Sequence, residues 1–115
     1  MPIDAKCVLM VSMDVLPEKE DLFNEVYDQE HIPNLLEVPG VLSAVRVRSE
    51  PFAMSIGGPR KETPAASPRY TAIYELESPD VLVSDAWAKA VEAGRWPGEV
   101  RPFTTNRRSV LSKLI

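Results

Sequence analysis

Four segments of the chain show the hydrophobic patterns of β-strands. Residues 7–15 (CVLMVSMDV) are apolar at most positions, which is typical of a strand whose two faces are both covered. Residues 41–48 (VLSAVRVR) end in valines that alternate with arginines, as in a strand with one polar side. Two further strands are predicted over residues 69–76 (RYTAIYEL) and 106–115 (NRRSVLSKLI).

A helix is predicted between the first two strands. Pro17 suits the first turn of a helix, and the acids that follow it suit the positive end of the helix dipole. One apolar stripe runs along this helix and consists of Leu22, Phe23, Val26 and Tyr27. Because Pro33 disfavours helical geometry at the preceding residue, the helix is expected to stop or kink near His31, before one more turn over residues 34–37.

The second helical segment covers residues 78–94. Ser78 is a candidate cap at its start and Ser84 a candidate cap within it, so one helix and two short helices both agree with the sequence. Residues 95–103 (RWPGEVRPF) are predicted as a connector. Residues 50–68 are rich in proline, glycine and serine and have no period, which predicts a long inserted loop that is either functional or mobile.

The order β-α-β-β-α-β predicts an α+β sandwich of the ferredoxin-like kind, in which a four-stranded antiparallel sheet carries both helices on one face. We expect a single domain over residues 1–115. Since the helices cover only one face of such a sheet, the apolar second face of the first strand needs another partner. A second copy of the chain, packed through a two-fold interface, is the simplest partner, so a homodimer is predicted.

Composition and charge narrow the functional classes. With 44% hydrophobic and 26% charged residues, the chain has the composition of a soluble globular protein. No segment approaches the roughly 18 consecutive apolar residues of a membrane helix. Residues 7–15 lack the features of a signal peptide, so a cytoplasmic protein is predicted. The net charge of −4, with only a small basic cluster in residues 95–115, argues against nucleic-acid binding.

The single histidine, His31, is the first candidate for chemistry. An imidazole with an ordinary pKa of about 6.5 accepts or donates protons at neutral pH. The alternative is a local role, in which His31 bonds a carbonyl freed by Pro33 or pairs with Glu30 or Asp28. A metal site is not predicted, because one histidine and one cysteine far apart in the sequence do not form a zinc pattern.

Tyr27 lies one turn before His31 on the same helix face, where it either acts on a substrate oxygen or belongs to the core with its hydroxyl satisfied at the edge. Ser12 and Asp14 lie near the end of the first strand, on its less apolar side. These two residues are candidates for lining the same cavity, and the alternative for Asp14 is a cap on the following turn.

Trp96 lies in a connector bounded by glycine and proline and is a candidate for a pocket wall, because loops often carry ligand contacts. Trp87 lies on a helix stripe and is predicted in the core. Arg101, together with Arg107 and Arg108, either binds a carboxylate of a ligand or forms salt bridges to the acid-rich N-terminal third.

The chain also carries an ordered set of motifs: E-H-x-P at residues 30–33, P-G at 39–40, R-Y-x-A-x-Y-E-L at 69–76 and E-S-P at 77–79. This set resembles the dimeric α/β-barrel superfamily, and the nearest branch is a group of uncharacterised bacterial proteins related to EthD. The resemblance runs over almost the whole chain except about residues 51–67, and it implies two ferredoxin-like subunits that pack their sheets face to face.

In EthD-like relatives an aromatic residue precedes the histidine by four positions, as Tyr27 precedes His31, but this chain has Val26 where close relatives place tryptophan. Members of the superfamily include cofactor-free and haem-degrading monooxygenases, isomerases, cyclases and decarboxylases.

The resemblance therefore implies a homodimeric enzyme without a cofactor that acts on a small aromatic or oxygenated metabolite. His31 would be the acid–base group with Tyr27 beside it, and the ligand contacts would come from Ser12, Asp14, Trp96 and Arg101. The alternatives are a non-catalytic small-molecule-binding or accessory protein of the same fold and a haem-binding monooxygenase. Neither a nucleic acid nor a membrane is expected as a partner.

Overall fold

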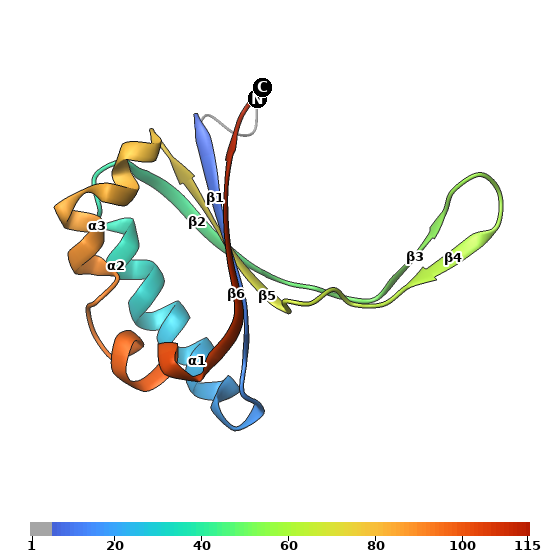
Figure 1. Ribbon diagram of the computed structural model, residues 1–115, viewed down its shortest axis with the longest axis horizontal. Helices are drawn as coiled ribbons and strands as arrows, with labels where there is room; N and C mark the ends of the chain where they lie inside the picture. Colours follow the sequence, from blue (N-terminus) through green and yellow to red (C-terminus); the bar gives the residue numbers. More distant parts are fainter. Residues whose placement is uncertain (1–5) are drawn as a thin grey trace.

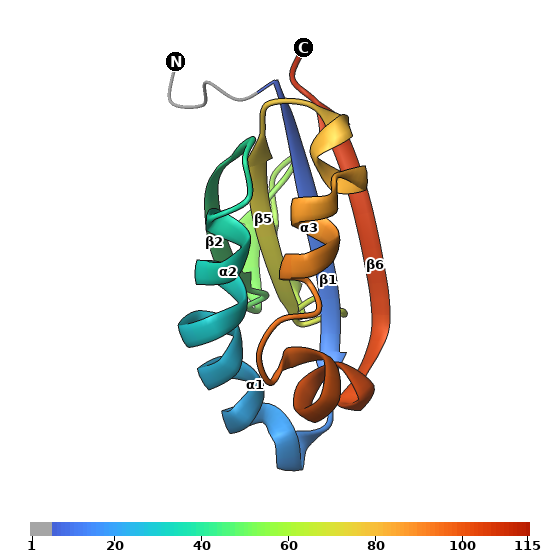
Figure 2. The same cartoon turned by 90° about the vertical axis from the view of Figure 1, so that its left-hand side faces the viewer.

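Two layers make up the body of the protein, a four-stranded sheet and a layer of short helices over one of its faces (Figures 1 and 2). The structure is a computed structural model that describes residues 6–115; residues 1–5 of the predicted domain lie outside the described part. The strands are β1 (Cys7–Val15), β2 (Val41–Arg48), β5 (Tyr70–Leu76) and β6 (Thr104–Lys113), in the spatial order β2-β5-β1-β6. All neighbouring strands are antiparallel, which confirms the predicted ferredoxin-like α+β fold.

The first helical segment is longer than predicted. A 3₁₀ turn (Pro17–Lys19) leads into α1 (Glu20–Val26), a π-helical turn (Tyr27–His31) and α2 (Ile32–Leu36) without a break. Of the stop or kink predicted near His31, the stop is wrong, because the chain continues into α2 with Pro33 near its start. The irregularity expected there takes the form of the π-helical turn. This wide turn is closed by the N–H of Ile32, which donates to the carbonyl of Tyr27.

The second helical segment consists of two short pieces, a 3₁₀ turn (Pro79–Val83) and α3 (Asp85–Ala90). Each piece has the serine cap that the sequence indicates: the Ser78 hydroxyl accepts from the N–H of Asp80, and the Ser84 hydroxyl accepts from the N–H of Trp87. Of the two alternatives left open by the sequence, the pair of helices is confirmed.

Residues 95–103, predicted as a connector, are helical as well. They form a π-helical turn (Trp96–Val100) and a 3₁₀ turn (Arg101–Phe103). Each turn has a proline near its start, and this is a position that prolines fill in helices as readily as in loops. The prolines were interpreted as signs of a connector, but in this segment they lie at the starts of two helical turns.

The loop predicted over residues 50–68 contains a second, two-stranded sheet. Its strands are β3 (Phe52–Ser55) and β4 (Arg60–Thr63), and this hairpin projects away from the body of the protein (Figure 1). Gly57 and Gly58 both have positive φ angles, at 69° and 126°, and turn the chain between the strands. The strands have four residues each, which is too short for alternation to stand out against a background of proline, glycine and serine.

The hydrophobic core lies between the sheet and the helices. Its seven largest fully buried side chains are Tyr74, Phe23, Met13, Leu35, Leu76, Val26 and Val100. Along β5 the buried residues alternate with half-buried ones, because successive side chains of a strand point to opposite faces. Among residues 6–115, no helix is long and apolar enough to cross a membrane.

The sheet face without helices carries an apolar row across all four strands. In this open-face row, Val45 pairs with Ile73, Ile73 with Met10, and Met10 with Val110. Val45 is exposed and the other three are half-buried. One hydroxyl pair flanks the row, where the side chains of Ser12 and Thr71 form a hydrogen bond of 2.8 Å.

Candidate functional site

A cavity of about 320 Å³ lies between the sheet and the helical layer. Its volume falls at the lower end of the range for small-molecule sites, which is about 300–1,000 Å³. Five ring-bearing side chains line it, namely Tyr27, His31, Tyr74, Trp87 and Trp96. The polar lining comes from Arg101, Arg107 and Ser109, and aliphatic side chains of β1 and the helices complete the walls. A cavity with apolar walls and a few polar groups is typical of a ligand site.

His31 lies in this cavity wall and is only 5% exposed. Its ring stacks on the indole of Trp96, with ring centroids 4.3 Å apart and an angle of 17° between the planes. The ring of Tyr27 meets His31 edge-on at 5.1 Å. His31 and Trp96 each belong to a π-helical turn, a rare structure that occurs often at functional sites.

The imidazole of His31 is neutral at physiological pH. Its Nδ1 atom is buried and has no hydrogen-bond partner within residues 6–115. Burial lowers the pKa of His31 to about 4, and the positive charges of Arg101 and Arg107 add to this effect. A neutral imidazole has one nitrogen that accepts a hydrogen bond, a proton or a metal.

The two acidic residues considered as partners of His31 bind arginines instead. Asp28 forms an ion pair with Arg46 at 2.7 Å, and Glu30 binds Arg95 rather than the histidine. One carboxylate oxygen of Glu30 accepts the backbone N–H of Arg95 at 2.9 Å, and the other accepts its Nε–H. These bonds, the backbone bond first, hold the pKa of Glu30 below its ordinary value.

The contact between Glu30 and Arg95 connects the two π-helical turns, because these residues directly precede His31 and Trp96. Gly94 permits this approach. It has a φ of 68°, and a Cβ atom at this position would lie 2.5 Å from a carboxylate oxygen of Glu30. The ion pair at the surface therefore positions the two stacked rings below it.

Tyr27 is buried at the back of the cavity, where its hydroxyl lies 3.4 Å from that of Tyr74. The guanidinium of Arg46 lies 4.5 Å from the centre of the Tyr27 ring. Burial raises the pKa of both tyrosines, so both phenols are protonated at neutral pH. Tyr27 is thus available as a hydrogen-bond donor and not as a phenolate base.

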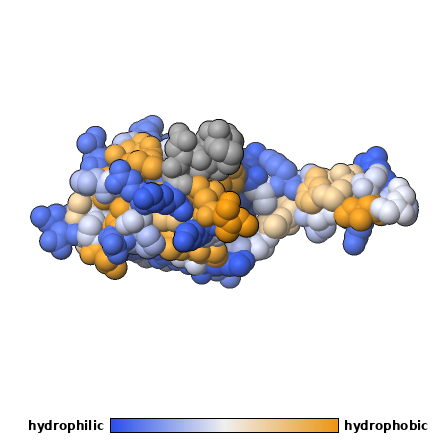
Figure 3. Space-filling view, turned by 90° about the horizontal axis from the view of Figure 1, so that it is seen from above, coloured by the Kyte–Doolittle hydropathy of each residue, from blue (hydrophilic) through white to orange (hydrophobic). Residues whose placement is uncertain are grey.

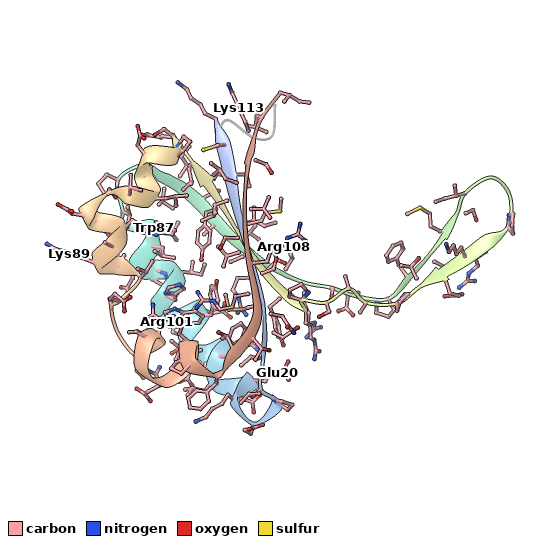
Figure 4. The ribbon with its side chains drawn as sticks, viewed as in Figure 1. Glu20, Trp87, Lys89, Arg101, Arg108 and Lys113 are labelled. Atoms are coloured by element: carbon pink, nitrogen blue, oxygen red, sulfur yellow. The ribbon has the colours of Figure 1, made fainter. Side chains whose placement is uncertain are left out.

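Two of the three candidate arginines line the cavity. Arg101 is held by a two-point ion pair with Glu92, at 2.9 and 2.8 Å, and lies on the helical side of the sheet together with Trp87 (Figure 4). Arg107 is exposed and forms no ion pair within residues 6–115. Arg108 follows it on β6 and points to the open face, opposite Ser12.

Ser12 and Asp14 do not line the cavity, so the expectation that they share it with His31 is corrected. Side chains alternate along β1, and Val11 and Met13 are the residues that face the helices. Ser12 and Asp14 therefore belong to the other face. The carboxylate of Asp14 accepts hydrogen bonds from Ser67, from Asn106 and from the backbone N–H of Arg69.

The structure brings together four of the six predicted site residues, namely Tyr27, His31, Trp96 and Arg101. Arg107, which the sequence grouped with Arg101, lines the cavity as well, and the structure adds Tyr74 and Ser109. Trp87 is half-buried, packs against the core as predicted and also lines the cavity. The alternation of Arg107 and Ser109 on one side of β6 is visible in the sequence. Which side faces the helices becomes evident only from the pairing of β6 with β1.

The low pKa of His31 makes protein stability depend on pH. As the pH falls from about 6.5 to 4, the unfolded chain binds a proton that the folded protein does not bind, so the free energy of unfolding decreases. At about 1.4 kcal/mol per pH unit, the loss due to His31 reaches roughly 3 kcal/mol. We expect the free energy of unfolding, measured with urea, to decrease between about pH 7.5 and pH 4 in both proteins, and to decrease by roughly 3 kcal/mol less in His31→Gln than in the wild type. Equal losses in both proteins would contradict the buried neutral state.

Comparison with known proteins establishes the fold. No protein-family model and no curated protein sequence matches the chain. Among solved structures, it is similar to an ethyl tert-butyl ether D (EthD) family protein from Bacillus halodurans, with a TM-score of 0.57 and 14% identity over 95% of this chain and 99% of that chain. HapK from Hahella chejuensis has a TM-score of 0.56 and 12% identity over 95% and 92% of the chains.

The haem-degrading protein MhuD from Mycobacterium tuberculosis, solved with two haems bound in its active site, is also similar, with a TM-score of 0.57 and 18% identity over 95% of each chain. The prediction of no cofactor from the family resemblance is therefore wrong, because a protein of this fold holds haem in its active site. The chain therefore has the ferredoxin-like fold that these solved structures share, as the ordered motifs indicated.

Proposed function

We propose that this protein is an enzyme that acts on a small, planar, oxygenated metabolite with an acidic group, and that His31 is its acid–base residue. One observation carries the proposal: a buried, neutral imidazole with an unpartnered nitrogen lies in an aromatic cavity that also contains two arginines. Unpartnered buried polar atoms are uncommon in proteins and often have a catalytic or binding role.

The aromatic and the basic residues of the cavity suit different parts of such a ligand. The rings of Trp87 and Trp96 offer flat apolar surface to a planar ligand. Arg101 and Arg107 offer guanidinium groups to a carboxylate or phenolate, and the lack of an acidic partner for Arg107 within the described residues leaves its charge available. With a volume of about 320 Å³, the cavity suits a ligand of one or two rings.

His31 would take a proton from a phenol, an enol or a carbon next to a carbonyl, and later return it. Its low pKa arises in part from Arg101 and Arg107. A bound anion offsets these charges, so ligand binding raises the pKa of His31 and strengthens it as a base. Tyr27 stays protonated and would donate a hydrogen bond from the back of the cavity.

A panel of phenols, lactones and keto acids tests this proposal. We expect His31→Gln to lower turnover at pH 7 by about 100-fold or more, as is typical when an acid–base residue is lost. Arg107→Gln should weaken binding of acidic ligands about tenfold, whereas Arg108→Gln, on the opposite face of β6, should leave it unchanged. Equal turnover in His31→Gln and wild type would remove His31 from the mechanism, and tight binding without turnover would favour the non-catalytic alternative.

Haem is a second candidate ligand, because the similar protein MhuD was solved with haem in its active site. The polar groups of this chain fit such a ligand, but a porphyrin is larger than the one or two rings that a cavity of about 320 Å³ suits, so haem binding would require the cavity to widen. His31 has a neutral imidazole with an unpartnered nitrogen, which suits an axial ligand, and Arg101 and Arg107 suit the propionate carboxylates. A bound haem would supply oxidation chemistry with oxygen.

Titration of the protein with haem distinguishes this candidate. Binding through His31 would shift the Soret band and quench tryptophan fluorescence, because Trp96 stacks on His31. We expect His31→Gln to abolish the Soret shift and Arg108→Gln to retain it. A wild-type spectrum that equals the sum of free haem and free protein would rule haem out.

We further propose that the chain forms a homodimer through the open-face row of Val45, Ile73, Met10 and Val110. An apolar row across a whole sheet is costly to leave in water, and two-fold packing of two such faces buries both. The proposal rests on this row and not on the cavity.

Sedimentation equilibrium at micromolar concentration tests the dimer. We expect a dimer for the wild type and a monomer for Ile73→Glu, because the substitution places a charge in the middle of the row. Lys89→Gln, an equal change of −1 in net charge on the exposed side of α3 (Figure 4), should remain dimeric. A monomeric wild type would contradict the proposal.

A further inference from the structure

The hairpin of β3 and β4 is the most exposed part of the protein. We call residues 50–68 the arm. Every residue of β3 is exposed, and all of β4 except Thr63. The arm is tied to the body at its base, where the N–H of Ser49 donates to the carbonyl of Arg69 at 2.8 Å and the Ser67 hydroxyl donates to Asp14 at 3.0 Å. A two-stranded hairpin by itself is marginally stable in water.

The two faces of the arm differ in chemistry. Cross-strand pairing places Phe52 opposite Thr63 and Met54 opposite Lys61, on one face. The other face carries Ala53 opposite Glu62 and Ser55 opposite Arg60. On this polar face Arg60 and Glu62 form an ion pair at 3.0 Å. The arm thus has the alternation of a strand pair that buries one face, although within the described chain nothing covers that face.

The exposed apolar side chains of the arm extend to its tip. Phe52 is 47% exposed, Met54 46% and Ile56, in the turn, 71%. The arm contains two acidic and two basic residues, which are Glu50, Glu62, Arg60 and Lys61. Since its formal charge is zero, apolar contact rather than attraction to a charged polymer or lipid surface is the force that suits it.

The direction of the arm indicates what it contacts. It leaves the body on the side of the sheet opposite to the helices (Figure 1), which is the side of the open-face row. The view from above shows it extending well beyond the body, with hydrophobic residues along it (Figure 3). A molecule seated on the open face would therefore lie beside the arm.

We propose that the apolar face of the arm packs against the flank of a second copy of this chain that is seated on the open face. The inference rests on the proposed homodimer and adds the arm as a second contact between the two copies. By two-fold symmetry, each copy contributes one arm to the other, so both arms bury Phe52, Met54 and Ile56.

The length of the arm agrees with this arrangement. From residue 49 to residue 56 the chain spans about 23 Å, at roughly 3.3 Å per residue of strand. Packed sheets lie about 10 Å apart, and a helical layer adds about 10 Å more. The arm is therefore long enough to pass the sheet of the second copy and place Met54 and Ile56 beside its helical layer.

Substitutions on the two faces of the arm test the proposal. The double variant Phe52→Ser/Met54→Ser removes the apolar face, and Ala53→Ser/Glu62→Gln changes the polar face as a matched control. By sedimentation equilibrium we expect the dimer dissociation constant to rise about 10- to 100-fold in the first variant and to change less than about threefold in the second. Unchanged far-ultraviolet circular dichroism would show that both variants fold, as expected for residues outside the core.

Hydrogen exchange gives a second readout. The amides of β3 should exchange slowly in the wild-type dimer and rapidly in the Ile73→Glu monomer, because burial against the second copy protects them. A monomeric wild type would overturn both the proposed dimer and the contact of the arm with the second copy. If Ile73→Glu dissociates the dimer but Phe52→Ser/Met54→Ser does not, the contact of the arm with the second copy is overturned and the dimer stands. Loss of the dimer in the arm variant with full retention in Ile73→Glu would overturn the seating on the open face.

Discussion

The coverage of the sheet on only one face is the constraint on which the rest of the structure depends. On the covered face, alternate residues of β1 and β5 are buried against the helices, and the cavity around His31 lies between these two layers. On the other face, the same alternation leaves an apolar row across four strands, with the arm projecting on that side. The proposed chemistry and the proposed association therefore use opposite sides of the same strands.

Within the covered layers, burial decides the chemistry of the histidine. A surface imidazole in the same helix would be hydrated and would titrate near neutral pH. His31 is stacked on Trp96, lacks a partner for Nδ1 and has a pKa of about 4, chiefly because of burial. The contact between Glu30 and Arg95, at the edge of the cavity, holds the two π-helical turns together. A polar contact near the surface thus keeps two apolar rings in place.

The comparisons with solved structures establish the fold but agree with more than one ligand and reaction. An EthD family protein and a haem-degrading protein share this fold with the chain at 14% and 18% identity, and a fold by itself does not determine a ligand. The residues of this chain carry the argument further. A neutral imidazole, flat aromatic walls and two guanidinium groups suit a planar molecule with an acidic group. A small phenolic acid matches both this chemistry and the volume of about 320 Å³, whereas haem matches the chemistry alone.

The sequence by itself determined the bounds of β1 and β2 and placed β5 and β6 within two residues, because continuous or alternating apolar patterns are local. It also placed Tyr27 and His31 on one helix face. It did not reveal the π-helical turns or the hairpin of β3 and β4, since segments of four or five residues have too few positions to show a period. Nor did it show that Ser12 and Asp14 face away from the cavity. Alternation tells which side chains share a face of a strand, but only packing decides which face meets the helices, and with it the buried, neutral state of His31.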